Sequence, residues 1–171
     1  MAVPQQGCGV IAARAEFPLG ATPDDIAGAA ADINAASAEM GQAIKAIEEF
    51  LELKNIGVPA WTKVKGWEEP ETGAFFRREL GYDRVAEAWH IAIRETSGNE
   101  ACPEQSDVSV WSFNSAPRKS RISAVDKLPD LLKELVKESE RVARRIREKT
   151  VEVNAFAASL NIATTPKKAK K

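Results

Sequence analysis

Apolar residues recur at heptad spacing in the first third of the chain. Ile26, Ile33 and Met40 lie seven residues apart, and an alanine-rich row runs beside them. Such a repeat predicts an amphipathic helix with one narrow apolar face. Thr22 is a good N-cap residue, and the two aspartates that follow it favour the positive end of a helix dipole. We therefore predict a helix over residues 22–54.

A second heptad repeat occupies the last third of the chain. Pro117 suits the first turn of a short helix that begins near residue 116, and Pro129 interrupts or restarts that helix. A long helix then follows to about residue 160. Its two rows are Leu128, Leu135, Val142, Lys149 and Phe156, and Leu132, Ser139, Ile146, Val153 and Leu160.

The pattern changes between residues 58 and 114, where aromatic and β-branched residues alternate with charged ones. The segments "WTKVKGW", "FFRREL" and "DVSVWSF" show this period of two, and glycine and proline residues separate them. Alternation of this kind is typical of half-buried strands. We predict an antiparallel meander of three or four strands.

The segment "GYDRVAEAWHIAIRE", residues 81–95, fits two structures. As a helix, it would align Tyr82, Val85, Trp89 and Ile93 on one apolar face. As a hairpin turning at "AEA", it lacks the Asn-Gly signal that marks most two-residue turns. Periodicity alone does not decide between them. We favour the hairpin because a helix would interrupt the meander with little room for connections.

Together these elements predict an α+β fold in which long N- and C-terminal helices form an antiparallel pair packed on a small antiparallel β-meander. We expect one domain over residues 1–160, with an extended arm at 1–20, the meander at 58–114 and helices at 116–160. Residues 161–171 are expected to be a disordered basic tail. A seam of two helices is too narrow to bury every apolar position, so we predict a homodimer, for example through a four-helix arrangement.

The composition is that of a soluble protein. The chain has 171 residues, of which 44% are apolar and 29% charged, and it has no apolar run of membrane-spanning length. The N-terminal segment does not resemble a signal peptide, which favours a cytoplasmic location. Cys8 and Cys102 form no CxxC pair and no metal-ligand spacing, so we expect two free thiols.

No known catalytic motif is present, and the chain has only one histidine, His90. On a strand, Asp83, Glu87 and Glu95 would all lie on the face opposite to His90. On a helix, Glu87 and His90 would touch. The simplest interpretation is a half-exposed histidine beside Trp89, and a pH-sensitive contact is a second one. We predict no catalytic residue, no metal site and no cofactor.

Charge is unevenly distributed. Residues 1–115 carry a net charge of −9, and residues 116–171 carry +8. Antiparallel pairing of the two long helices would set these charges against each other. Alternatively, the basic residues could bind nucleic-acid phosphates, which requires only positive charge along a surface. The basic stretches contain no aromatic residue for base stacking. The candidate phosphate contacts are Arg118, Lys119, Arg121, Arg141, Arg144 and Arg145.

All four tryptophans lie in the predicted meander. Trp61 and Trp67 would share one face of a regular strand. Core packing under the helices is one interpretation, and an exposed aromatic face that binds a peptide or a second copy is the other. The candidate interaction residues are Trp61, Trp67, Trp89, His90 and Trp111.

The segments "LGYDRVAEAWHIAIRE" and "WSFNSAPRKSRISAVDKLPDLLKEL" resemble parts of small uncharacterised bacterial proteins, some of them encoded on phages or other mobile elements. The resemblance covers about residues 60–145 and implies a hairpin followed by a strand that leads into helices. It implies no activity and no functional residues. From the absence of catalytic motifs, the apolar helix faces and the aromatic-rich meander, we predict a non-enzymatic protein-interaction or regulatory module with an unknown protein partner and no membrane association. The resemblance adds an accessory protein of a phage or other mobile element as its setting. The alternative is a nucleic-acid-associated protein.

Overall fold

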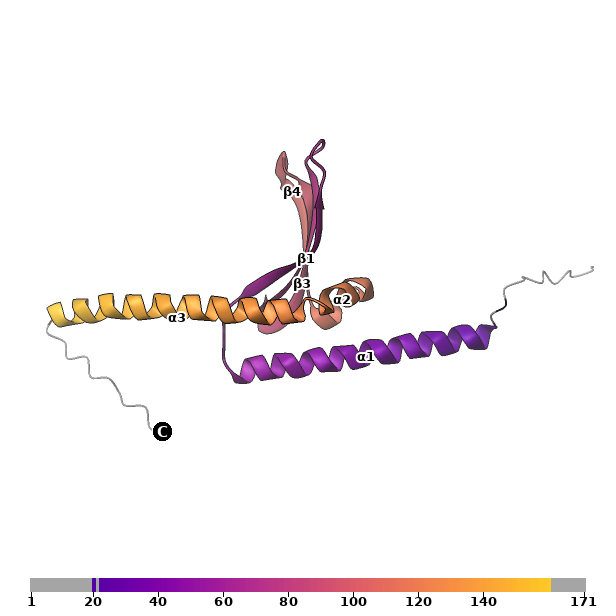
Figure 1. Ribbon diagram of the computed structural model, residues 1–171, viewed down its shortest axis with the longest axis horizontal. Coiled ribbons are helices and arrows are strands. Elements are labelled where there is room, and N and C mark those ends of the chain that lie inside the picture. The colour runs from indigo at the N-terminus through magenta and orange to yellow at the C-terminus, as the bar shows by residue number, and fades with distance from the viewer. Residues whose placement is uncertain (1–19, 21, 161–171) are drawn as a thin grey trace, which may run out of the picture. The chain divides into compact units, whose positions relative to one another are not determined.

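The computed structural model describes residue 20 and residues 22–160. The predicted arm at 1–19 and the predicted basic tail at 161–171 lie outside the described residues. The chain divides after Ala36 into two compact units, with the boundary inside the first helix. The elements in order (Figure 1) are α1 (Pro23–Leu53), β1 (Ala60–Glu68), β2 (Ala74–Val85), β3 (Ala88–Asn99), β4 (Cys102–Ser112), η1 (Phe113–Ser115), α2 (Arg118–Val125) and α3 (Leu128–Ser159).

In the first unit, the structure describes the N-terminal half of α1. The Asp25 backbone N–H donates to the Thr22 hydroxyl over 3.2 Å, and the Thr22 hydroxyl and backbone N–H both donate to the Asp25 carboxylate, over 2.7 Å and 2.8 Å. This reciprocal arrangement is a capping box, and its hydrogen bonds lower the pKa of Asp25. Ile26 and Ile33 are both exposed on this part of the helix.

The second unit contains a four-stranded antiparallel sheet in the order β1-β2-β3-β4. Each strand therefore pairs with the next one along the chain, and the sheet is a meander. Together with the helices it makes an α+β fold, as predicted. The ends of the β1–β2 and β3–β4 hairpins project away from α2 and α3 (Figure 1).

The segment at 81–95 is a hairpin, and the helical alternative is wrong. The β2–β3 register runs without interruption from Ala74 opposite Asn99 to Val85 opposite Ala88. The turn residues Ala86 and Glu87 have φ values of 50° and 70°. A two-residue turn with positive φ at both positions matches the twist of the flanking strands. The long ladder and buried side chains of β2 and β3 outweigh the strain of placing non-glycine residues there.

Strand β1 contains a bulge, because its register against β2 shifts between Lys63 and Lys65. Trp61 lies opposite Gly81, whereas Trp67 lies opposite Phe76. Alternate residues of β2 point to opposite faces, so the two tryptophans do as well. The prediction that they share a face is wrong, because one extra residue reverses the alternation.

The core of this unit lies between the helices and one face of the sheet. The strands contribute Leu80, Tyr82, Ile91 and Ile93, which alternate with residues of the far face. The remaining buried residues come from β1, the part of α1 after Ala36, the segment after β4, α2 and the start of α3. They are Ala60, Ile44, Leu51, Phe113, Ala116, Ala124, Leu131 and Leu135.

The two long helices meet the core over only part of their lengths. Leu51 of α1 and Leu135 of α3 belong to the same buried cluster. Beyond Ala143, however, α3 extends past the sheet and its residues are exposed, apart from the half-buried Ala157 (Figure 1). This packing does not establish the predicted antiparallel pairing along an apolar seam, which stays a prediction.

Candidate functional site

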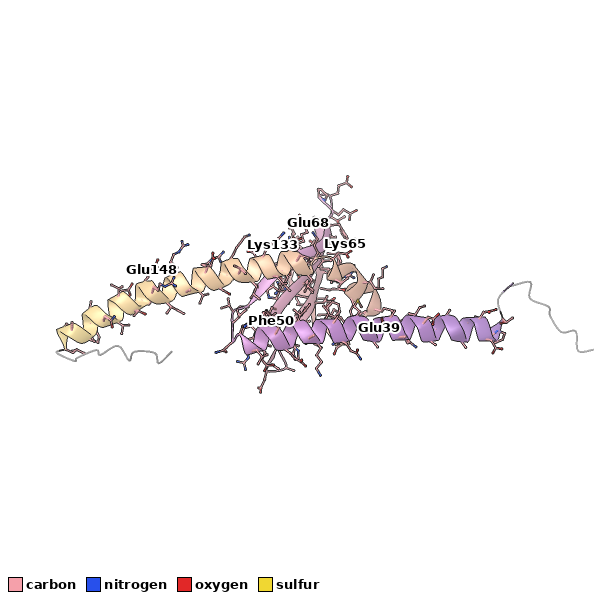
Figure 2. The ribbon with its side chains drawn as sticks, turned by 60° about the horizontal axis from the view of Figure 1, so that its bottom comes forward. Glu39, Phe50, Lys65, Glu68, Lys133 and Glu148 are labelled. Carbon is pink, nitrogen blue, oxygen red and sulfur yellow. The ribbon has the colours of Figure 1, made fainter. Side chains whose placement is uncertain are left out.

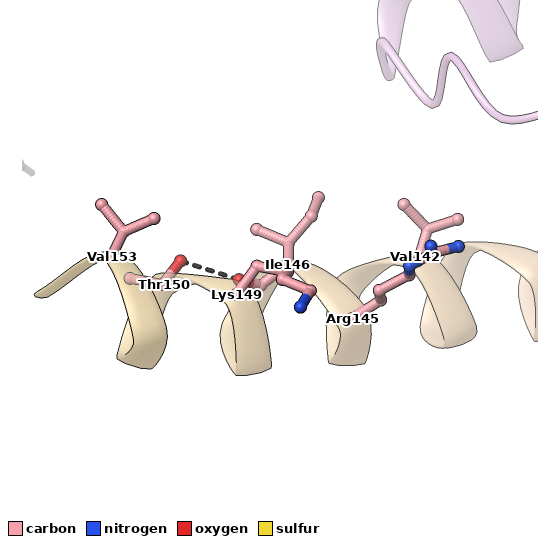
Figure 3. Close-up of a pocket in the computed structure, with 6 residues that line it drawn as sticks. All are labelled: Val142, Arg145, Ile146, Lys149, Thr150 and Val153. Carbon is pink, nitrogen blue, oxygen red and sulfur yellow. Dashed lines mark hydrogen bonds between the residues drawn. The ribbon is translucent and has the colours of Figure 1, made fainter. Parts of the chain in front are cut away.

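The first candidate surface is the apolar face of α3 beyond the core. We call the residues Val142, Ile146, Lys149, Thr150 and Val153 the α3 stripe; they line a shallow depression with Arg145. Figure 3 shows Val142, Ile146 and Val153 projecting from the same side of the helix. Ile146 is 61% exposed, although its heptad row runs beside the row that contains the buried Leu135.

Two polar residues on this face have hydroxyls that are already hydrogen-bonded. Thr150 Oγ1 donates to the carbonyl of Ile146 over 2.7 Å (Figure 3), and Ser139 Oγ donates to the carbonyl of Leu135 over 2.7 Å. Neither hydroxyl needs water as an acceptor for its proton. The face can therefore be covered by an apolar partner with little loss of hydrogen bonding.

An apolar groove adjoins the stripe where the end of α1 approaches α3. It has a volume of about 540 Å³. We call it the α1–α3 groove and define it by Phe50, Leu51, Leu132, Val136, Ser139 and Ala143, which line it. Phe50, labelled in Figure 2, and Val136 are both more than half exposed. The groove therefore continues the apolar surface of the stripe toward the core.

The predicted phosphate contacts lie on two elements, α2 and α3. Arg118 and Lys119 lie in the first turn of α2. Arg121 is turned inward: its Nη2 donates to Ser37 of α1 over 2.9 Å, and its buried Nε has no hydrogen-bond acceptor. On α3, Arg141 pairs with Glu138 over 2.9 Å, and Arg144 and Arg145 are exposed.

The lysines of α3 make their ion pairs within that helix. Lys133 lies 3.8 Å from Asp130, and Lys137 lies 2.8 Å from Glu134. The Asp130 carboxylate also accepts a hydrogen bond from Lys127, which lowers the pKa of Asp130. These pairs are local, so they do not require the charge complementarity between the two long helices that the sequence suggested.

His90 lies beside the Glu48 carboxylate, which accepts a hydrogen bond from the backbone of β3. Glu48 of α1 accepts a hydrogen bond of 2.7 Å from the Ile91 N–H, and its Oε1 lies 3.6 Å from His90 Nδ1. The β3–β4 ladder ends at Ala92 opposite Ser112, so Glu48 satisfies a backbone donor that no strand pairs. This contact explains the position of His90 without catalysis.

The four tryptophans are distributed over both faces of the sheet. Trp61 lies on the far face, where its Nε1 donates to Asp83 over 3.1 Å and the Arg94 guanidinium lies 4.1 Å from its ring. Trp89 stacks on Tyr82 with a centroid distance of 5.2 Å, and Trp111 packs against the core. Trp67 is 52% exposed. The candidate residues Trp61, Trp67, Trp89, His90 and Trp111 therefore do not form one aromatic face.

Other site chemistry is not evident in residue 20 and residues 22–160. Within these residues, no three His, Cys, Asp or Glu side chains gather in a way that could hold a metal ion. Among the described helices, none has the length and apolar character needed to cross a membrane. Cys102 is a half-buried free thiol, and Cys8 lies outside the described residues.

No protein-family model, curated protein or solved structure matches this chain. The resemblance to small bacterial and phage-encoded proteins therefore stays a prediction. Any functional proposal rests on the surfaces described above.

Proposed function

We propose that this chain is a non-enzymatic protein-interaction module that self-associates through antiparallel pairing of its α3 helices. The observation that carries the proposal is that the apolar rows of α3 continue past the core as the exposed α3 stripe. Such a module would suit an accessory or regulatory protein of a phage or other mobile element, the setting that the sequence resemblance implies.

The exposed part of α3 favours a partner on energetic grounds. Isolated helices of about four turns are marginal in water, because helix nucleation is costly and most helical stability in proteins comes from packing. Residues 144–159 leave Ile146, Val153 and Phe156 in solvent. Covering them would add the apolar contacts that this segment does not make with the rest of residues 22–160.

One antiparallel register matches apolar positions of two copies and also pairs their flanking charges. We place the two-fold axis between Arg147 and Glu148, so that the helices run in opposite directions. Val142 then lies opposite the partner's Val153, and Ile146 lies opposite the partner's Lys149. The methylene groups of Lys149 can cover the isoleucine while its ammonium group reaches water.

The charges that flank the stripe favour the antiparallel orientation. In this register Arg145 lies beside the partner's Glu152, and the two-fold axis repeats the pair. A parallel dimer would instead place Lys149 opposite the partner's Lys149 and Arg145 near the partner's Thr150. It would thus bring like charges together and form no flanking ion pair.

The same register offers an occupant for the α1–α3 groove. Phe156 is 66% exposed at the end of α3 beyond the core. The register sets the partner's Phe156 opposite Ser139, which lines the groove. A phenyl ring there would contact Phe50 and Val136 and bury all three side chains. The ion pair between Arg145 and the partner's Glu152 and the placement of Phe156 in the groove therefore favour the same antiparallel register.

The test is size-exclusion chromatography with light scattering on the wild-type chain and two variants. We expect wild type at twice the chain mass of 18.6 kDa and Ile146→Asp as a monomer, because a buried carboxylate would oppose pairing. Val151→Asp is the matched control: Val151 is 69% exposed and lies on the opposite side of α3 from the stripe. A wild-type monomer at all concentrations, or equal effects of the two variants, would contradict the proposal.

A further inference from the structure

A second candidate site lies where the β1–β2 hairpin passes α2. The cleft has a volume of about 460 Å³, within the range of about 300–1,000 Å³ that is usual for small-molecule sites. We call it the sheet–α2 cleft and define it by Lys65, Trp67, Phe76, Arg78 and Lys119. None of the residues that line it is acidic. Lys65, on the β1 side of the cleft, is labelled in Figure 2.

The strand register builds this cleft from two cross-strand pairs. Trp67 lies opposite Phe76, and Lys65 lies opposite Arg78, all on one face of the sheet. The two pairs are adjacent along the hairpin, so an aromatic surface directly adjoins a cationic one. This combination arises only because the β1 bulge turns Trp67 to the face on which α2 lies.

The positive charge of the cleft is only partly neutralised by the protein. Arg78 Nε donates to Glu95 over 2.8 Å, and its Nη1 donates to Ser123 over 2.9 Å. These two hydrogen bonds fix the position of the guanidinium. Lys65 lies directly opposite this arginine, and like charges in that position are destabilising. Lys119 adds a further ammonium group from α2. The cleft thus presents cations in excess and would attract an anion.

The exposed ring of Trp67 favours a ligand that carries a flat aromatic group in addition to the anion. This ring is half exposed beside Phe76, although tryptophan usually buries most of its surface in a fold of this size. A flat aromatic group could stack on the exposed ring, where its contact would replace water. Aromatic stacking platforms beside positive charge are the usual means by which proteins hold single-stranded nucleic acid.

We propose that the sheet–α2 cleft binds a nucleotide, with its base stacked on Trp67 and its phosphate near Lys65 and Lys119. The nucleotide can be free or part of a single strand, since both present the same base and phosphate. This site uses no residue of the α3 stripe, so nucleotide binding and α3 pairing can be tested independently of each other. The basic sequence stretches contain no aromatic residue. In the fold, Trp67 and Phe76 of the β1–β2 hairpin lie beside Lys119 of one of these stretches.

The experiment is fluorescence polarisation of a short fluorescein-labelled oligothymidylate at low salt, with thymidine 5′-monophosphate as an unlabelled competitor. Trp67→Ala should weaken binding by about tenfold, the loss expected when one stacked base loses its aromatic partner. Trp67→Phe should retain most of the affinity. Lys65→Glu and Lys119→Glu should each weaken binding, while Lys133→Glu, an equal charge change on α3, should weaken it less.

The two ligand sources give different results, and each supports the site. Competition by the mononucleotide at similar affinity identifies a free nucleotide, and failure to compete identifies a strand. Circular dichroism of Trp67→Ala checks that the sheet is intact, and the lysine variants test the cleft even if that variant unfolds. The proposal is overturned if neither ligand binds, or if the cleft variants bind like wild type. It is also overturned if only truncation after Asn161 removes binding.

Discussion

The two halves of α3 carry the same heptad pattern and have opposite environments. Leu135 is buried against the sheet and the end of α1, whereas Ile146 and Phe156 lie in solvent. Nothing in the spacing or type of these residues separates the two groups. The difference shows that a heptad row identifies an apolar face, but not whether the same chain supplies what covers it.

The difference has a simple geometric origin. The sheet and the part of α1 after Ala36 provide apolar contacts only along the first turns of α3. At a rise of about 1.5 Å per residue, a helix of this length extends well beyond the strands that it crosses. The first half is therefore held by contacts within the described residues 22–160, whereas those residues leave most of the second half in solvent.

The largest expected effect follows from removing a buried side chain in the first half. Leu135→Ala should lower the free energy of unfolding by about 2–5 kcal/mol, because the core loses apolar contacts and gains a cavity. Val151→Ala, in the exposed half, should change it by less than about 0.5 kcal/mol. Urea unfolding of both variants in an Ile146→Asp background separates folding from association. Equal losses would show that the two halves do not differ as described.

The next largest expected effect is on self-association and comes from a substitution in the exposed half of α3. Lys149→Leu should strengthen self-association, since the new side chain would bury apolar surface against the partner's Ile146. Each such burial contributes about 2 kcal/mol when complete. Sedimentation equilibrium measures the change in dimer dissociation constant. Arg144→Leu adds a similar apolar group away from the stripe and should leave that constant nearly unchanged; a comparable gain there would indicate non-specific association.

Reversal of the flanking charges tests the direction of pairing with a smaller effect. Arg145→Glu and Glu152→Arg should each weaken the dimer, because exposed pairs contribute roughly 0–1 kcal/mol each. Combining them in one chain should restore affinity, since the two ion pairs re-form with their charges exchanged. The same sedimentation experiment reads out all three variants. A double variant weaker than both single variants would exclude the proposed register.

The smallest expected effect lies in the first turn of α3. The hydrogen bond and charge of Lys127 lower the pKa of Asp130 below its ordinary value of 3.8. The carboxylate form is therefore favoured in the folded state, and its stabilisation is complete above that value and lost as pH falls through the lowered pKa. At pH 7, Asp130→Asn should unfold with a slightly lower urea midpoint concentration than wild type. At very low pH the two midpoints should be equal. A difference that grows with acid would contradict this assignment.

The candidate surfaces differ in how far the sequence predicted them. The heptad rows contained every residue of the α3 stripe except Thr150, but the sequence suggested that α1 would cover them. For the sheet–α2 cleft, Lys119 and Trp67 were named separately, one as a phosphate contact and the other as an interaction residue. Their proximity could not be read from spacing, because they lie on segments far apart in the chain. The role of Glu48 was also missed, since an unpaired N–H on β3 exists only where β4 ends.

The sequence by itself determined the type of the elements between β1 and α3. Alternation of period two identified the strands, because side-chain periodicity is a local property of the backbone. At residues 81–95 periodicity did not decide, and the hairpin was favoured because a helix would have interrupted the meander. Only the tertiary structure decided which faces those elements bury. A one-residue bulge at Val64 set Trp61 and Trp67 on opposite faces. The extent of the sheet then decided where the apolar rows of α3 leave the core, because burial depends on contacts between distant segments.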